Sequence, residues 1–233
     1  MRTSRVIWPT SAATGAFGYA DHVQGLFITF EGAEGVGKTT QIARAAAHLR
    51  TRGVDPLVTR EPGGTPLAER LRSLVLDPGQ APVTATAELL LMFAARASHV
   101  AEVIGPALEA GRSVLCDRFT DATEAYQGGG RGVNRDWIRA LAGIAHPGLL
   151  PDLTIIFDAP ATVAHARLVG RGGRQDRIEA EGDAFFERVR ASYLAIAARE
   201  PQRVKVVDAT RPEADVAASV ATLLDAALAK ESQ

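Results

Sequence analysis

Short apolar runs alternate along the chain with longer segments whose apolar residues recur every three or four positions. The short runs lie at 26–30, 56–60, 113–117, 153–158 and 203–208. Runs of this length, bounded by turn-forming or charged residues, predict β-strands, and a continuous apolar run indicates a strand buried on both faces. We therefore expect five strands.

Helical periodicity fills the intervals between these runs. Helices are expected at 38–52, 66–76, 86–110, 120–127, 134–145, 183–199 and 212–230, with one more beginning at Pro160. Thr65 is expected to cap the second helix, Pro66 to lie in its first turn, and Pro106 to begin the last segment of the long third helix. The glycines at 128–130 and at 132 are expected to separate the helices on either side of them.

Strands that alternate with helices predict an α/β fold with a five-stranded parallel sheet covered by helices on both faces. The chain has 233 residues, 46% of them apolar and 23% charged, which fits one globular domain, expected over residues 25–230. Residues 1–24 are expected to be a flexible extension or the product of an over-early start codon. Their arginines and hydroxyl residues, with no acid before Asp21, also give them a faint likeness to a transit peptide.

Charge and cysteine content narrow the class of protein further. The formal net charge is -1, so no overall positive field exists to hold nucleic acid or an acidic membrane. No apolar run reaches the 18 residues of a membrane-spanning helix. Cys116 is the one cysteine and the five histidines lack ligand spacing, so we expect no internal disulfide, no structural zinc site and a cytoplasmic location.

Residues 32–39, GAEGVGKT, match the phosphate-binding motif G-x-x-x-x-G-K-[ST] between an expected strand and an expected helix. The backbone N–H groups of such a P-loop and the helix dipole behind it attract phosphate. Lys38 is expected to bind the β- and γ-phosphates, and the Thr39 hydroxyl to bind Mg²⁺. The expected nucleotide-binding residues are Gly32, Ala33, Glu34, Gly35, Val36, Gly37, Lys38, Thr39 and Thr40. The motif predicts triphosphate binding, but motors, switches and transporters carry it too.

Two further segments carry candidate binding residues. Arg60 ends the second expected strand, and an arginine at the carboxyl end of a parallel strand faces the ligand crevice, where it can bind a monophosphate. The alternative is a solvated turn with a surface ion pair between Arg60 and Glu61. Phe93 and Arg96 share a helical face, so the ring could stack on a base while the guanidinium bonds its edge. Alternatively, Phe93 is a core residue and Arg96 a surface charge.

Asp117 and Arg118 end the third expected strand. An acid at this position can hold Mg²⁺ or its water shell, and the arginine could reach both phosphate chains. The alternative is a structural salt bridge between the two.

Arg171, Arg174 and Arg177 lie in an expected glycine-containing loop, at about 170–179. On a mobile loop, three arginines would suit a lid that neutralises transition-state charge and excludes water. The alternative is an exposed basic loop without such a role.

Taken together, these segments resemble the thymidylate kinase family, whose members phosphorylate dTMP to dTDP with ATP. The resemblance covers about residues 25–225 and rests on FEGAEGVGKTT, TREPGGT, LMFAAR, DRF, AYQGGGRG and DRIE, which stand in the family's order and approximate spacing. It implies a P-loop kinase fold, ATP and Mg²⁺ as cofactors, and a homodimer. The rival interpretations are another nucleoside monophosphate kinase, acting on dUMP, UMP or GMP, and a non-metabolic P-loop switch.

The resemblance implies roles around the acceptor's phosphate and sugar. Arg60 and Arg118 match acceptor-phosphate ligands. Glu34 resembles the family's acid near the 3′-hydroxyl. Tyr126 matches the aromatic residue packed under the deoxyribose, where a 2′-hydroxyl would clash.

For the acceptor base, the resemblance implies a second set of residues. Phe93 matches the ring that stacks on thymine, and Arg96 the arginine at the base edge. Thr123 and Gln127 fall where base-reading side chains lie.

The variable positions of the P-loop hold no basic residue, which resembles the bacterial branch of the family, whose catalytic arginines lie in the lid. The expected catalytic residues are Lys38, Arg118, Arg177 and Arg171. The expected reaction is direct in-line transfer, in which positioning and charge neutralisation lower the barrier and no covalent intermediate forms.

Overall fold

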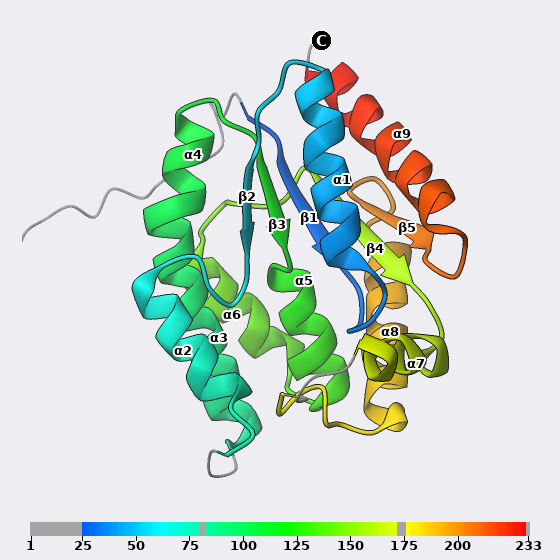
Figure 1. Cartoon of the computed structure of the whole chain (residues 1–233). Helices are drawn as coiled ribbons and strands as arrows, with labels where there is room; N and C mark the ends of the chain where they lie inside the picture. The colour runs from blue at the N-terminus through cyan, green and yellow to red at the C-terminus, as the bar shows by residue number, and fades with distance from the viewer. Residues whose placement is uncertain (1–24, 80–82, 172–175, 232–233) are drawn as a thin grey trace, which may run out of the picture.

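The five predicted strands form one parallel sheet in the computed structural model, which describes residues 25–79, 83–171 and 176–231 (Figure 1). The strand order is β2-β3-β1-β4-β5. The strands are β1 (Phe27–Glu31), β2 (Leu57–Arg60), β3 (Val114–Asp117), β4 (Leu153–Asp158) and β5 (Val204–Asp208). Because β1 lies between β3 and β4, the loop that follows it begins at the centre of the sheet's carboxyl edge, where α/β proteins place their ligands.

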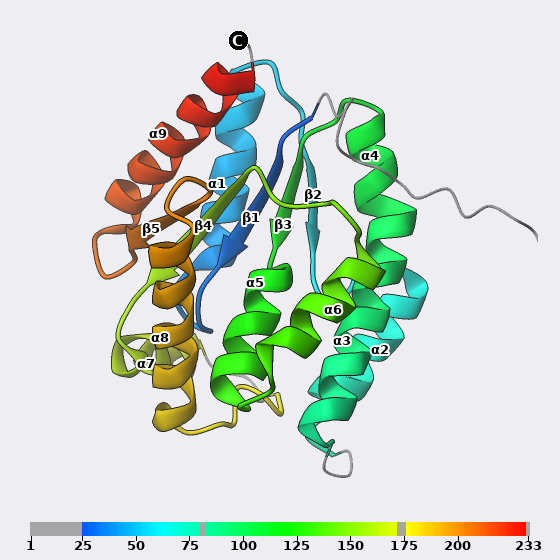
Figure 2. The same ribbon diagram turned by 180° about the vertical axis from the view of Figure 1, so that it is seen from behind.

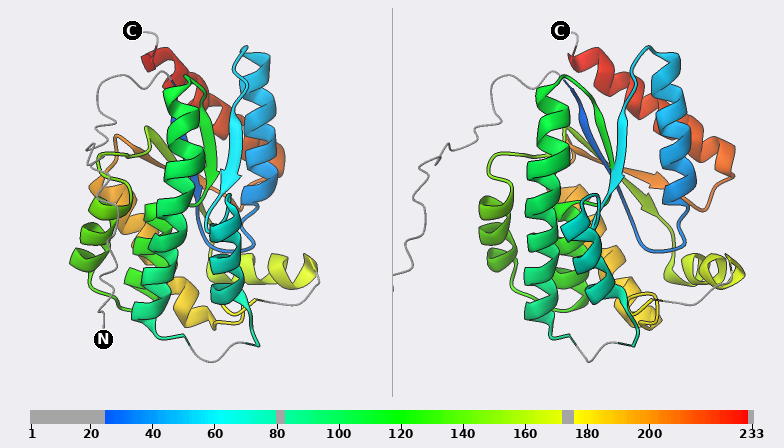
Figure 3. Two further views of the ribbon diagram at one scale, coloured as in Figure 1. Left: turned by 90° about the vertical axis from the view of Figure 1, so that its left-hand side faces the viewer. Right: turned by 60° about the vertical axis from the view of Figure 1, so that its left-hand side comes forward.

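Helices cover both faces of the sheet, as predicted. The first, α1 (Lys38–Thr51), and the last, α9 (Glu213–Glu231), pack against each other on one face (Figures 1 and 3). The other face carries α8 (Asp183–Arg199) and the helices that follow β2 and β3 (Figure 2). The remaining α-helices are α2 (Pro66–Leu76), α3 (Ala85–His99), α4 (Gly105–Glu109), α5 (Thr120–Thr123), α6 (Arg135–Ala145) and α7 (Ala161–Arg171). This arrangement confirms the predicted α/β fold class.

The central strands are buried on both faces, which explains their continuous apolar runs. Every residue of β1 is buried; Ile28 and Phe30 join the main apolar cluster, to which α1 contributes, while Phe27 joins a second cluster with residues of α4 and of the segment just before it. Across the sheet, Phe30 stands opposite Asp117, and Asp117 opposite Arg60. The ends of three neighbouring strands therefore lie side by side.

The helix after β3 corrects a prediction made from glycine. The three glycines at 128–130 do not end it, because α5 continues as the π-helical segment η2 (Glu124–Gly130). A Cβ on Gly130 would lie 2.5 Å from the ring of Phe185, and one on Gly129 would lie 2.7 Å from Cβ of Ser192. The glycines therefore allow η2 and α8 to approach closely, an advantage that a local helix-breaking rule does not take into account.

The long third helix is also interrupted in a way that periodicity did not predict. A π-helical segment, η1 (Val100–Ile104), separates α3 from α4, which has Pro106 in its first turn as expected. Thr65 caps α2 by accepting a hydrogen bond from the N–H of Ala68, also as expected.

The segment expected as an arginine-bearing loop is helical at its start, since α7 extends to Arg171. Arg174 and the extension at 1–24 lie outside the described residues. In the part of the chain that the structure describes, none of the helices has the length and apolar character needed to cross a membrane.

Candidate functional site

A cavity of about 600 Å³ lies at the carboxyl ends of β1, β2 and β3. It brings together side chains of the P-loop, the ends of β2 and β3, and the helices α3, α5 and η2. The predicted site residues that line it are Glu34, Gly35, Gly37, Lys38, Thr39, Thr40, Arg60, Arg96, Asp117, Arg118, Thr123, Tyr126 and Gln127. The P-loop and most of the predicted acceptor residues therefore share one cavity.

Backbone shape in the P-loop depends on its glycines. Gly32 and Gly35 have φ values of +130° and +77°, and a Cβ on either would lie 2.5 Å or less from a carbonyl oxygen, that of Phe157 or Ala164 respectively. Ala33 and Val36, by contrast, turn inward and join the main apolar cluster. The loop is therefore anchored by two apolar side chains while its glycines let β4 and α7 approach.

Lys38 lies buried at the start of α1, with its ammonium group turned back over the loop. Its Nζ donates to the carbonyl oxygens of Ala33 at 2.8 Å and Gly32 at 3.2 Å. Burial lowers the pKa of Lys38, and the Arg118 guanidinium lowers it further, while the carboxylates of Glu34 and Asp117 oppose both effects. The ammonium is thus fixed in position at the floor of the cavity.

Asp117 lines the cavity with one carboxylate oxygen unsatisfied. Its Oδ1 is buried and has no hydrogen-bond partner among the described residues. An orphaned carboxylate oxygen in a cavity that Thr39 also lines fits a hard cation, which favours oxygen ligands. In the described ranges, no cluster of three His, Cys, Asp or Glu residues could bind a metal alone, so a cation here would take further ligands from phosphate and water.

Arg118 is the hub of the polar network in the cavity. Its backbone has φ of +71°, in the left-handed region that non-glycine residues rarely adopt. Its Nη1 donates to the Gly32 carbonyl at 2.9 Å and to the Tyr193 hydroxyl at 3.1 Å. Its Nη2 donates to Oε1 of Glu34 at 2.7 Å and to the Tyr126 hydroxyl at 3.0 Å. The guanidinium is therefore fixed from four sides, which predisposes it to bind an anion in one geometry.

The Glu34–Arg118 pair keeps both side chains charged. Burial works against the charged form of Glu34, but Arg118 and then Lys38 lower its pKa to about 2. Burial likewise opposes the charge of Arg118, while Glu34 and two tyrosines hold its pKa above the usual value. The predicted alternative, a salt bridge between Arg118 and Asp117, is wrong, because Arg118 pairs with Glu34.

Arg60 and Glu61 do not form a surface ion pair with each other, so the alternative interpretation of this segment is wrong. Arg60 is half-exposed at the cavity and donates two hydrogen bonds to Glu69, at 2.9 and 3.1 Å. Glu61 is buried and accepts from Nε of Arg96 at 2.7 Å. Its other oxygen lies 3.0 Å from Nδ1 of His99. Arg60 is thus free to exchange an exposed partner for a ligand.

Arg96 is buried rather than exposed, which also rules out its reading as a surface charge. Besides Glu61, its guanidinium donates from Nη2 to the carbonyl of Phe119 and the hydroxyl of Thr123, both at 3.0 Å. Nη1 is buried and lacks a partner among the described residues. Arg96 lines the cavity, so its unpartnered Nη1 is a hydrogen-bond donor that a ligand in the cavity could use.

Phe93 packs in an apolar cluster with Leu89 and Ile138, and the Arg96 guanidinium lies over its ring at 4.8 Å from the centroid. The neighbouring side chain, Met92, lines the cavity. Met92 stands four residues before Arg96 and so shares its helical face. This spacing could have identified Met92 from the sequence, but the aromatic Phe93 was the more obvious candidate.

Gln127 and Arg177 meet at a buried acid. Glu88 accepts a hydrogen bond from Nε2 of Gln127 at 2.7 Å and forms an ion pair with Arg177. Arg177 also donates from Nε to the carbonyl of Val75 at 2.7 Å. In this structure Arg177 therefore ties the segment after α7 to α2 and α3.

Two cavity-lining arginines were missed by sequence reasoning. Arg72 of α2 donates to the Pro62 carbonyl at 3.0 Å, and Arg167 of α7 donates to the Ala209 carbonyl at 2.8 Å. Both lie inside expected helices, where an arginine has no local feature that distinguishes it from a solvated one. They add positive charge to the rim of the cavity.

Comparison with known proteins gives a consistent picture. The family profile for thymidylate kinase matches residues 30–220. The chain is 56% identical over 200 residues to a thymidylate kinase of Pseudomonas savastanoi pv. phaseolicola, which covers 86% of this chain and 95% of that protein. It is 55% identical over 202 residues to that of Pseudomonas entomophila, with coverage of 87% and 96%.

A solved structure supports the same assignment. The crystal structure of thymidylate kinase from Ehrlichia chaffeensis is similar with a TM-score of 0.69 and 34% sequence identity, over 86% of this chain and 98% of that chain. Sequence, sheet topology and the phosphate-binding loop thus agree. The chain belongs to the thymidylate kinase family.

Proposed function

We propose that the cavity binds ATP with Mg²⁺ on its P-loop side and dTMP on the side of α3 and η2, so that the protein transfers the γ-phosphoryl group to dTMP and forms dTDP. Family membership supports the acceptor, since the related proteins are thymidylate kinases. The observation that carries the proposal is the shared cavity, in which Lys38 and the polar set around Arg96 line one space. A nucleotide switch binds one nucleotide and needs no second set of ligand-binding residues.

The donor nucleotide would be held by the P-loop. Its backbone N–H groups and the start of α1 provide the positive potential for the phosphates, and Lys38 would donate to the β- and γ-phosphates. Thr39 and Asp117 would hold Mg²⁺, directly or through water. When bound, the ion neutralises and orients the phosphate oxygens.

The acceptor phosphate would lie between Arg60 and Arg118. Arg60 can leave Glu69 because that pair is half-exposed and weakly held. Tyr126, whose ring lies 4.8 Å from the Arg118 guanidinium, would pack under the deoxyribose, and Glu34 would accept from the 3′-hydroxyl.

The acceptor base would lie against α3 and η2. Arg96, with its unpartnered Nη1, would donate to a base carbonyl, and Thr123 and Gln127 would contact the base edges. We propose that Met92 supplies the apolar surface on this side. The predicted stacking role of Phe93 is then reduced to packing beneath Arg96.

Catalysis would consist of alignment and charge neutralisation. The dTMP phosphate oxygen is already anionic near neutral pH and needs no strong base to attack the γ-phosphorus. Lys38 and Arg118 would stabilise the charge on the transferring group. The lid arginines remain predictions: for Arg177 to reach the phosphates, its contacts with Glu88 and the Val75 carbonyl must break, and Arg171 stands at the end of α7.

A coupled assay of ADP release with a panel of monophosphates tests the proposal. We expect turnover with dTMP to exceed that with dUMP, UMP and GMP, and no turnover without an acceptor. Equal kcat/KM for UMP would assign the cavity to a ribonucleotide, and ATP hydrolysis without any acceptor requirement would favour a switch.

We also propose that the protein is a homodimer. Large apolar side chains are exposed on the adjoining helices α3 and α6, namely Leu90 at 52%, Trp137 at 56% and Ile144 at 77%. A second copy would bury them. Light scattering should give twice the chain mass, and Trp137→Glu should reduce it to one chain; a monomeric wild type would reject the proposal. The cytoplasmic location remains a prediction.

A further inference from the structure

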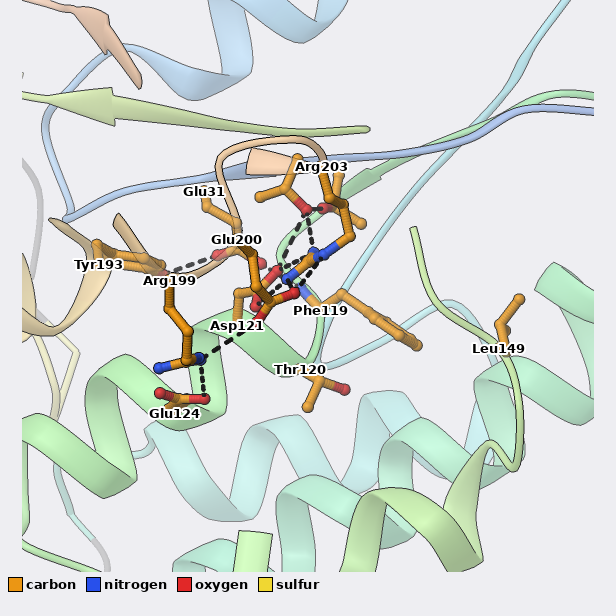
Figure 4. Close-up of polar contacts among 12 residues, drawn as sticks. Glu31, Phe119, Thr120, Asp121, Glu124, Leu149, Tyr193, Arg199, Glu200 and Arg203 are labelled. Atoms are coloured by element: carbon orange, nitrogen blue, oxygen red, sulfur yellow. Dashed lines mark hydrogen bonds and ion pairs between the residues drawn. The ribbon is translucent and has the colours of Figure 1, made fainter. Parts of the chain in front are cut away.

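The carboxylate of Glu31, the last residue of β1, is fully buried and holds two groups next to the cavity (Figure 4). Its Oε1 accepts the backbone N–H of Phe119 at 2.7 Å. Its Oε2 accepts the hydroxyl of Tyr193, on α8, also at 2.7 Å. Glu31 is not among the residues that line the cavity.

Both contacts lead to Arg118. Phe119 directly follows Arg118, so the Glu31 hydrogen bond fixes the peptide that leaves the left-handed backbone at φ of +71°. The Tyr193 oxygen, whose hydrogen is donated to Glu31, accepts from Nη1 of Arg118 at 3.1 Å. One carboxylate thus constrains the backbone and the guanidinium of the same arginine.

We propose that Glu31 is a positioning residue for Arg118, which it holds through the Phe119 peptide and the Tyr193 hydroxyl in the geometry that binds the acceptor phosphate. The proposal rests on the role given to Arg118 in the proposed function. In this proposal Tyr193, which lies 75 residues after Arg118 in the chain, contributes to acceptor binding without contacting the acceptor.

The neighbouring acid does not share this role. Asp121 is held by Arg203, which donates to its two oxygens at 2.7 and 3.0 Å (Figure 4). Arg203 is also paired with Glu200. Asp121 therefore has its own cation, and Glu31 is the acid that faces Tyr193 and the Phe119 peptide.

The buried environment makes the Tyr193 hydrogen bond consequential. Burial, and then the nearby charge of Asp121, raise the pKa of Glu31 to about 8, although Arg118, Tyr193 and the Phe119 N–H favour its ionised form. The carboxyl and the phenol thus meet in one short contact, away from water. A hydrogen bond in such a place fixes orientation more strongly than an exposed one.

A kinetic double-mutant cycle tests the proposal. Tyr193→Phe removes one hydroxyl, so Arg118 Nη1 keeps only the Gly32 carbonyl. We expect this variant to lower kcat/KM for dTMP about tenfold, as for one hydrogen bond to a charged group, and to leave the KM for ATP unchanged. In an Arg118→Lys background the same substitution should have no further effect, because its effect passes through the guanidinium.

Glu31→Gln is the second variant. Its amide oxygen can still accept from Phe119, but its NH₂ group cannot accept from the Tyr193 hydroxyl. We expect a loss in the same direction. Ile196→Val, on the buried face of α8 one turn from Tyr193, is the control for mild destabilisation and should keep wild-type kinetics for dTMP.

The outcomes separate the inference from the function it rests on. If Tyr193→Phe had wild-type kinetics, or lost as much activity with Arg118→Lys as without it, the positioning proposal would be rejected. If Arg118→Lys alone had wild-type kcat and KM for dTMP, the proposed role of Arg118 would be rejected too.

Discussion

Arg118 and Glu34 face each other across 2.7 Å in the cavity, so a fixed cation and a fixed anion stand together where we place the acceptor phosphate. The pKa of Glu34, about 2, keeps its carboxylate ionised over the working range of pH. An incoming phosphate dianion therefore meets a negative charge that is offset mainly by Arg118, with Lys38 as the next cation.

This pairing leads to the first prediction. Arg118→Ala should lower kcat/KM for dTMP at least ~100-fold, because it removes a ligand and also the main cation that offsets the charge of Glu34. Adding Glu34→Gln to Arg118→Ala should recover part of the loss, mainly in the KM for dTMP. Steady-state ADP release measures both. A double variant no better than Arg118→Ala would show that repulsion by Glu34 is not part of the defect.

The second prediction concerns the ammonium at the floor of the cavity. Lys38→Ala should lower kcat at least ~100-fold at saturating substrates, because it removes the charge placed against the transferring phosphates. Lys230→Ala, at the exposed end of α9, is the matched control and should have wild-type kcat. Near wild-type turnover by Lys38→Ala would reject its assigned role.

Met92 and Phe93 can be distinguished by what each substitution changes. Met92→Ala should raise the KM for dTMP and cost less stability than Phe93→Ala, because Met92 lines the cavity and is only partly buried. Phe93→Ala should lower the free energy of unfolding by about 3–5 kcal/mol, because Phe93 lies in the apolar cluster. Urea unfolding and dTMP kinetics measure the two effects. A Phe93→Ala variant of normal stability but weakened dTMP binding would restore the stacking role predicted from sequence.

Two helical glycines form a matched pair for stability. Gly130→Ala should destabilise the protein by about 1–3 kcal/mol, because its Cβ would lie 2.5 Å from the Phe185 ring. Gly143→Ala, in α6, meets no atom within 4 Å and should stabilise by roughly 0.5–1 kcal/mol through helix propensity. Chemical denaturation measures both free energies of unfolding. Equal effects of the two substitutions would contradict the close packing of η2 on α8.

His146 predicts how stability depends on pH. It is buried, with Nδ1 positioned to donate to the Leu149 carbonyl at 3.0 Å and Nε2 to accept from the Thr120 hydroxyl at 2.7 Å, so the neutral ring satisfies both contacts. Burial, and then the charge of Arg96, lower its pKa from 6.5 to about 4. Between these values the unfolded chain binds a proton that the folded chain does not, so this contribution to stability is lost as pH falls.

The expected loss is about 3 kcal/mol between pH 6.5 and 4. The difference in free energy of unfolding between the wild type and His146→Gln should therefore shrink as pH falls across this window. Urea titrations at several pH values measure it. A difference independent of pH would show that His146 is protonated in the folded protein.

Local sequence determined much of the fold. The run at 153–158 became β4 with the predicted bounds, because a strand of a parallel sheet that is covered on both faces has a continuous apolar sequence. The P-loop was recognisable because its backbone needs glycine at fixed spacing. By contrast, the glycines at 128–130 were misread, since their value lies in the approach of α8, which no nearby residue encodes.

Which side chains form the site was harder to predict, because this too depends on contacts between residues far apart in the sequence. Glu61 and Arg96 are 35 residues apart, and only tertiary folding brings them, from the end of β2 and from α3, into a buried pair. Whether Met92 or Phe93 faces the cavity depends on how α3 is rotated about its axis, which an apolar pattern does not resolve. Long-range contacts of this kind leave no periodic trace in a single sequence.

The close packing of α7 on the P-loop limits which substitutions the loop can accept. At Gly35 the backbone oxygen of Ala164 already occupies the space that a Cβ would need, 2.2 Å away. A basic side chain at that position and the present placement of α7 are mutually exclusive. Mutation could place a charge at this position only together with a displacement of the helix, so residue 35 and the placement of α7 are expected to change together among descendants of this chain.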